Sequence, residues 1–365
     1  MNKTVVVKVG TSSITNEDGE ISQESVAKIC HEVAELKSSE NNVVIVTSGA
    51  IAAGLPFLGL TGGNRPQDSS TLQAISAIGQ GSLIGIYREE LANHELLAGQ
   101  VLLAPLDFFV RSQYLHARNT LTKLIDLGVI PIVNENDAIA DDEIRFGDND
   151  RIAALVAHLV EADLLVLLTD TLGLFTADPR MDSEASLIEE IIEIDQEMER
   201  YAGGTSSDRG SGGMASKLAA AKIASWSGVR TVIADASRVE ILKDACEEVN
   251  GIGTVVHPRD VRLNARKLWI AFAVGSAGQI MVDSGARQAL EGRASLLPTG
   301  VLKSIGDFEV GDAVEVIDEN SKIFAKGIVR QDSENVTANA GLNTSQLSEG
   351  ISHEVIHTDD LVILP

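Results

Sequence analysis

Short apolar runs alternate with amphipathic segments through the first 257 residues, and this alternation restricts the possible folds more than any other feature. The runs are rich in valine, isoleucine and leucine, as in strands that are buried on both faces. They cover residues 4–9, 43–46, 100–104, 129–133, 162–169 and 230–234. Apolar residues at helical spacing separate them, over residues 22–38, 71–92, 112–127, 152–157 and 218–227. This pattern predicts an α/β domain in which helices cover both faces of a mainly parallel sheet.

The composition excludes several classes of protein. The 365 residues include 29 basic and 53 acidic ones, for a net charge of −24, which repels nucleic acid and anionic membranes. The two cysteines, Cys30 and Cys246, have neither disulfide nor metal-site spacing. No apolar run approaches the ~20 residues of a membrane span. Because a strand is expected to begin at residue 4, we expect no signal peptide. We expect a cytoplasmic protein.

The pattern changes after residue 257. Residues 258–277 carry a proline and a basic patch, and they indicate a linker. From residue 278 the chain has short strand patterns over 312–317, 323–329 and 361–364, which predict a small β-rich domain. Residues 278–365 hold six lysines and arginines against fourteen acidic residues, a balance that argues against an RNA-binding surface there.

Three segments of small residues stand beside strands or helices. Gly10–Ser13 and Thr47–Gly54 follow the first two strands, and residues 206–217 run into a helix. Backbone N–H groups in such positions bind anions. Lys8, at the end of the first strand, and Lys217, at the start of the helix, supply nearby positive charge. Alternatively, Lys8 could be an ordinary lysine on an exposed strand face, and residues 206–217 could be a flexible linker with a serine that caps the helix.

An acidic stretch, residues 134–154, leaves the end of a buried strand, where open α/β sheets bind ligands. It contains Asp137 and Asp150 together with Asn149. One interpretation is a solvated loop with a capping residue. The other is an active-site loop in which Asp150 orients the two lysines and keeps them protonated. Three anion sites, two lysines and this loop favour phosphoryl transfer from a nucleotide, although neither a Walker A motif nor the protein-kinase motifs are present.

Six motifs in this order resemble the amino acid kinase family, and residues 278–365 resemble a PUA domain. The motifs are VVVKVGTSSIT (5–15), VIVTSGAIAAG (44–54), IPIVNENDAIA (130–140), FGDNDRIAALVA (146–157), LLTDTLGLFTADPR (167–180) and GSGGMASKLAAA (210–221). The resemblance implies a three-layer kinase domain over 1–257, a linker over 258–277 and a PUA-like domain over 278–365. Three positions depart from the family pattern: Ser211 replaces a threonine, Leu72 a lysine and His116 an asparagine.

The resemblance also implies an activity and a set of site residues. NEND and GDND are typical of the branch that phosphorylates the γ-carboxylate of L-glutamate with ATP to give L-glutamyl 5-phosphate, the first step of proline biosynthesis. The implied catalytic residues are Lys8, Lys217 and Asp150. The implied glutamate-binding residues are Ser48, Asp137 and Asn149. The implied ATP-binding residues are Lys8, Gly10, Thr169, Asp170, Ser211, Gly212, Gly213, Met214, Ala215, Ser216 and Lys217.

Further expectations follow from the same resemblance. Mg²⁺ would be carried by the ATP phosphates without dedicated protein ligands. Proline would inhibit at or near the glutamate site, with residues 141–146 as a gate, and the protein would form a homo-oligomer, a dimer or a tetramer.

Three other functions are compatible with parts of the sequence. The acceptor could be N-acetylglutamate, aspartate, carbamate or a nucleoside monophosphate, which the NEND and GDND motifs disfavour. The chain could bind RNA through its PUA-like domain, which the negative charge disfavours. The kinase half could be a ligand sensor, which the presence of Lys8, Asp150 and Lys217 disfavours.

Overall fold

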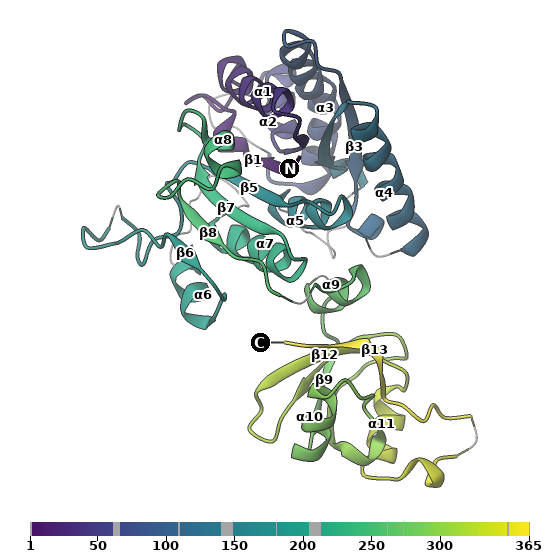
Figure 1. Ribbon diagram of the computed structural model, residues 1–365. Coiled ribbons are helices and arrows are strands. Elements are labelled where there is room, and N and C mark those ends of the chain that lie inside the picture. Colours follow the sequence, from purple (N-terminus) through teal and green to yellow (C-terminus); the bar gives the residue numbers. More distant parts are fainter. Residues whose placement is uncertain are drawn as a thin grey trace. The chain divides into compact units, whose positions relative to one another are not determined.

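The computed structural model describes residues 2–60, 66–108, 110–139, 149–179, 181–203, 213–260, 262–272, 274–348 and 350–364. The chain forms two compact units, residues 1–262 and residues 263–365 (Figure 1). Within the described part of the chain, none of the helices combines the length and the apolar character needed to cross a membrane.

The first unit is built on one large sheet. In the described residues this sheet has eight strands, in the order β3 (Ala98–Leu103), β4 (Ile130–Glu135), β2 (Asn42–Thr47), β1 (Thr4–Val9), β5 (Leu164–Thr169), β7 (Arg230–Asp235), β8 (Thr254–Val256) and β6 (Glu190–Ile191). Neighbouring strands are parallel except for β7 and β8, which are antiparallel. The prediction of a mainly parallel sheet is confirmed, whereas the short strands β6 and β8 were not predicted.

Helices cover both faces of this sheet (Figure 1). One face packs against α1 (Gln23–Ser38), α3 (Ser69–Ala92) and α8 (Ile241–Cys246). The other packs against α4 (Arg111–Asp126), α5 (Asn149–Leu159) and α7 (Met214–Trp226). Side chains of β1 alternate between the faces: Val5, Val7 and Val9 join the core beneath α1 and α3, so Lys8 points toward α5 and α7.

Helices α5 and α7 both start earlier in the sequence than the apolar pattern indicated. The pattern places their first turns at Ile152 and Leu218, but α5 begins at Asn149 and α7 at Met214. Polar and small residues are compatible with a first helical turn, where a carboxylate also interacts favourably with the helix dipole. Asn149, Asp150 and Lys217 are therefore held by helices.

A close contact of two glycines joins α2 (Ala50–Gly54) to α3. A Cβ on Gly79 would lie 2.0 Å from the carbonyl oxygen of Ala50, and one on Gly54 would lie 2.2 Å from that of Ile75. Only glycine permits this approach of the two backbones. Gly81 is a second glycine inside α3. Nothing lies within 4 Å of its Cβ position, so close packing does not explain this glycine.

The second unit has its own sheet and core. Its described strands run in the order β10 (Val301–Gly306), β9 (Gly278–Val282), β11 (Ala313–Ile317), β12 (Ile323–Val329) and β13 (Ile356–Ile363). Helices α10 (Ser284–Glu291) and α11 (Ser333–Asn339) complete it, with Phe308 and Phe324 in the core. The β-rich character is as predicted, and the pairing of β9 with β11 is parallel.

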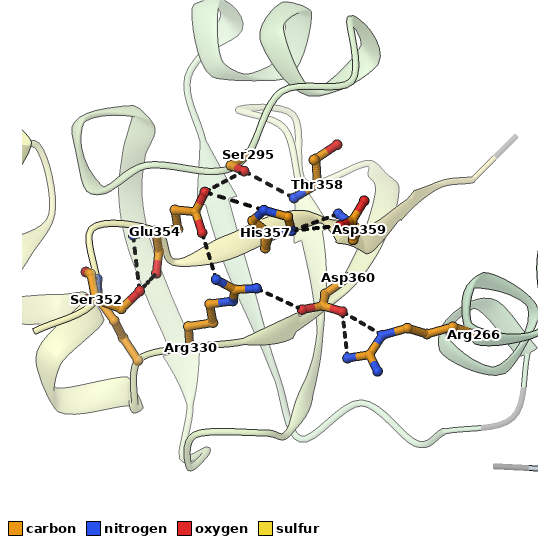
Figure 2. Close-up of polar contacts among 10 residues, drawn as sticks. Arg266, Ser295, Arg330, Ser352, Glu354, His357, Thr358, Asp359 and Asp360 are labelled. Carbon is orange, nitrogen blue, oxygen red and sulfur yellow. Dashed lines mark hydrogen bonds and ion pairs between the residues drawn. The ribbon is translucent and has the colours of Figure 1, made fainter. Parts of the chain in front are cut away.

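An additional helix, α9 (Ala265–Phe272), lies in the segment that the sequence indicates as a linker and packs against β12 and β13. Figure 2 shows the polar contacts between α9 and β13 and their neighbours. Arg266 donates to Asp360 on β13 at 2.6 Å, and Arg330 links the same carboxylate to Glu354, at 3.4 and 2.9 Å. Arg266, a residue of the predicted basic patch, therefore forms an ion pair within the second unit.

Candidate active site

Three charged side chains meet beneath α5 and α7, at the carboxyl end of β1. Lys8 Nζ lies 2.5 Å from Oδ1 of Asp150, and Lys217 Nζ lies 3.1 Å from Oδ2 of the same carboxylate. The Asp150 side chain is 0% exposed, and those of Lys8 and Lys217 are 4% and 6% exposed. One buried carboxylate thus bridges two buried ammonium groups.

The charges in this cluster determine its chemistry. Burial alone would raise the pKa of Asp150, but the two ammonium groups outweigh it and hold the pKa below its ordinary value. The cluster of two cations and one anion has a net positive charge. An anion placed against it would meet two ammonium groups that are already in position, so little reorganisation is needed when charge develops.

Ser216 adds a hydroxyl to the same carboxylate. Its Oγ lies 2.9 Å from Oδ2 of Asp150 and 2.8 Å from the carbonyl oxygen of Gly213. The hydroxyl has one hydrogen, so it can serve either acceptor. Because Ser216 and Lys217 are neighbours in the first turn of α7, that turn is joined to Asp150 by two side chains.

The described residues that are expected to bind ATP lie at the ends of β1 and β5 and at the start of α7. Gly10 follows β1, and a Cβ there would lie 3.7 Å from Lys8 Nζ, an ordinary contact. Thr169 ends the adjacent strand β5, and its hydroxyl donates to Asp170 at 3.2 Å. Gly213 precedes α7, and Met214 and Ala215 are its first two residues. Ser211, Gly212 and the expected gate at 141–146 lie outside the described residues.

A network of amide and hydroxyl groups includes Ser48 and Asn149, two of the residues that are expected to bind the acceptor. Asn149 Nδ2 donates to Ser48 Oγ at 2.9 Å and to Asn134 Oδ1 at 3.0 Å. Asn134 in turn donates to Gln80 Oε1 on α3 at 2.7 Å. These groups are uncharged and could hydrogen-bond a carboxylate without repelling it.

Asp137 lies beyond the end of β4, in a short 3₁₀ turn, η4 (Asp137–Ile139), and is held by α3. Ser76 Oγ donates to its Oδ2 at 2.6 Å. Burial raises the pKa of Asp137, and this hydrogen bond partly opposes the increase. A half-buried carboxylate of this kind is suited to bind a cation, since a positive partner would replace the solvation that it has lost.

The predicted residues thus form two groups. The structure brings Lys8, Asp150 and Lys217 into direct contact and places Ser48 beside Asn149. In the described residues, Asp137 has neither a hydrogen bond nor an ion pair with any of these five. Sequence reasoning did not assign roles to Asn134, Ser76 and Gln80. The four-residue spacing of Ser76 and Gln80, which places both on one face of α3, was the available signal.

Comparison with known proteins identifies the family of each unit. The model of the amino acid kinase family matches residues 3–235, and that of the PUA domain matches residues 278–350. A carbamate kinase from Giardia lamblia bound to AMP-PNP superposes with a TM-score of 0.51 at 18% identity, covering 71% of this chain and 99% of that one, which is a likeness of fold.

Three curated relatives are similar over nearly their whole length. Glutamate 5-kinase of Caldanaerobacter subterraneus subsp. tengcongensis is 42% identical, over 99% of this chain and 97% of the relative. Glutamate 5-kinases of Pelobacter propionicus and Thermobifida fusca are 42% and 40% identical, over 99% of this chain and 98% and 93% of the relatives. The predicted family resemblance is confirmed, and the chain belongs to the amino acid kinase family.

Proposed function

We propose that this chain is a glutamate 5-kinase, which transfers the γ-phosphoryl group of ATP to the γ-carboxylate of L-glutamate. The structural observation that carries the proposal is the buried cluster of Lys8, Asp150 and Lys217. The 42% identity to a glutamate 5-kinase over 99% of the chain supports the choice of acceptor.

The proposed reaction needs no general base. A γ-carboxylate oxygen forms the new bond to the γ-phosphorus, the bond to the bridging oxygen breaks, and ADP leaves with that electron pair. The carboxylate is already deprotonated near neutral pH, so the site must position two anions and stabilise the charge that develops between them. Lys8 and Lys217 supply positive charge for this, and Asp150 fixes their positions without leaving the cluster negative.

Acceptor recognition is assigned to residues on the other side of the cluster. Asp137 would pair with the α-ammonium group of glutamate. Ser48 and Asn149 would donate hydrogen bonds to its carboxylates, and Asn134 orients Asn149 through the contact at 3.0 Å. Hydrogen bonds to charged groups are stronger than those between neutral groups, so these side chains favour glutamate over an uncharged acceptor.

ATP recognition is assigned to the loops around β1, β5 and α7. The proposed contacts come from Lys8, Gly10, Thr169, Asp170 and residues 211–217. In the described part of the chain, no group of three or more histidine, cysteine, aspartate or glutamate side chains could hold a metal ion. Mg²⁺ would be bound through the ATP phosphates and would neutralise part of their charge.

Regulation, assembly and location complete the proposal. Proline shares the α-carboxylate and the ammonium group of glutamate, so it would compete for the same side chains. A homo-oligomer is favoured by two exposed leucines: Leu97, next to the edge strand β3, is 70% exposed, and Leu127, at the end of α4, is 64% exposed. We place the protein in the cytoplasm. Inhibition assays with proline and light scattering test the first two points.

The proposed function is tested by trapping the acyl phosphate with hydroxylamine in the presence of ATP and Mg²⁺. Free glutamate, N-acetylglutamate, aspartate and carbamate are compared as acceptors. The proposal predicts hydroxamate from glutamate only, with suppression by proline. Product from another acceptor alone would assign Ser48, Asp137 and Asn149 to a different substrate, and the absence of product with every acceptor would overturn the proposed activity.

A further inference from the structure

One face of α3 contacts both Asp137 and the hydrogen-bond network of Ser48, Asn134 and Asn149, which together form the proposed acceptor side of the site. Ser76 and Gln80, one helical turn apart, reach Asp137 and Asn134 at 2.6 and 2.7 Å. Side chains four residues apart lie on the same face of a helix. A single rigid element therefore sets the positions of the turn that carries Asp137 and of the end of β4.

The position of α3 is itself fixed relative to Ser48. Gly79, between Ser76 and Gln80, contacts the backbone of α2 so closely that no Cβ fits, with Ala50 O only 2.0 Å from the Cβ position. Helix α2 begins two residues after Ser48. Ser76 is thus held in a defined place relative to the acceptor-side network, and it is 3% exposed.

The contact between Ser76 and Asp137 controls how the carboxylate is presented. The hydroxyl donates to Oδ2, while Oδ1 has no hydrogen bond to any residue in the described ranges. A donor on one oxygen fixes the side-chain rotation, stabilises the charged form of a partly buried acid and leaves the other oxygen for a second cationic or polar group.

We propose that Ser76 is a positioning residue for recognition of the acceptor's amino group: it holds Oδ2 of Asp137 so that Oδ1 faces the α-ammonium of glutamate. The inference rests on the proposed function, because it needs an acceptor with an ammonium group. The competing explanation is that Ser76 only satisfies a buried carboxylate and stabilises the turn, with no effect on how substrate binds.

A double-mutant cycle separates these explanations. Ser76→Ala, Asp137→Ala and the double variant are compared by KM and kcat for glutamate and by KM for ATP. We expect Ser76→Ala to raise the glutamate KM roughly 10-fold, the effect of one hydrogen bond to a charged group, with kcat and the ATP KM close to wild type. In the Asp137→Ala background the same change should have no further effect, and Ser76→Thr, which keeps the hydroxyl, should restore the KM.

The matched control is Ser225→Ala, which removes another buried serine hydroxyl, one that donates to His257 O at 2.8 Å. It should lower the melting temperature to a similar degree and leave the glutamate KM unchanged. The same increase in KM in both Asp137 backgrounds, or an unchanged KM in Ser76→Ala, would overturn the role of Ser76. A wild-type protein that does not phosphorylate glutamate would instead overturn the proposed function, so the two failures are distinguishable.

Discussion

Lys8 at the end of β1 and Asp150 in the first turn of α5 form a buried ion pair with 2.5 Å between Nζ and Oδ1. The residues are distant in the sequence, and the ion pair joins the central strand to the helix above it. Lys217 contacts the second oxygen of the same carboxylate. Asp150 is therefore the residue on which the geometry of both lysines depends.

Asp150→Asn should weaken the fold in a pH-dependent manner. The substitution removes the carboxylate that pairs with two buried ammonium groups, and breaking a buried pair in this way lowers the free energy of unfolding by about 3–5 kcal/mol. The folded-state pKa of Asp150 lies below the ordinary value of 3.8. The stabilisation by the wild-type carboxylate is therefore complete above that value and is lost as the pH falls through the lower, folded-state pKa.

The measurement is urea unfolding of both proteins from neutral to acidic pH. The difference between them should shrink on acidification. A difference that stays constant over the whole range would show that the charge on Asp150 is not what stabilises the site.

Lys8→Ala and Lys217→Ala should each lower kcat by about 100-fold or more, since each removes one preorganised positive charge from the phosphoryl group. The fold should survive, because Asp150 keeps one ammonium partner. Lys222→Ala is the control: Lys222 lies on the same helix but pairs with Glu199 on the surface, at 2.7 Å. Turnover that persists in either site variant would refute the assigned role of that lysine.

Asp137→Asn should separate stability from substrate binding. Because burial raises the folded-state pKa of this acid, its ionised form opposes folding near neutral pH, and the neutral amide should leave the melting temperature equal or higher. The glutamate KM should rise while kcat changes less. Thermal melts and steady-state kinetics test both points, and a lower melting temperature with an unchanged KM would contradict them.

Gly79→Ala and Gly81→Ala should have opposite effects although they lie in the same helix. The first places a Cβ 2.0 Å from a backbone oxygen and forces α2 and α3 apart, which lowers stability by about 1–3 kcal/mol or more. The second meets nothing within 4 Å and should raise stability by up to ~1 kcal/mol. Equal effects in chemical denaturation would show that the contact between α2 and α3 is not tight.

The strands of the first unit were predictable because their signal is local. The valine-rich pattern over residues 4–9 matches β1 residue for residue, and the strand–helix alternation is sufficient to predict a parallel sheet. The starts of α5 and α7 were less predictable, since Asn149–Asp150 and Met214–Lys217 carry no apolar periodicity. Strand β6 has two residues, too few for any pattern.

The site could be predicted in part for the same reason. Lys8, Asp150 and Lys217 stand at the ends of recognisable elements, so a shared sheet edge was foreseeable. The contact of Ser76 with Asp137 joins residues 61 positions apart and depends on the close packing of α2 and α3. Such a contact follows from tertiary packing, which local sequence patterns do not specify.

The most direct test of the account is to follow an oxygen atom from the acceptor to phosphate. Glutamate labelled with ¹⁸O in its γ-carboxylate is incubated with ATP, Mg²⁺ and hydroxylamine, and the released phosphate is examined by ³¹P NMR. If the γ-carboxylate attacks the γ-phosphorus, hydroxylamine cleaves the acyl phosphate at carbon and each phosphate carries one ¹⁸O. Unlabelled phosphate would mean that water attacks ATP, and it would contradict the assignment of this site to carboxylate phosphorylation.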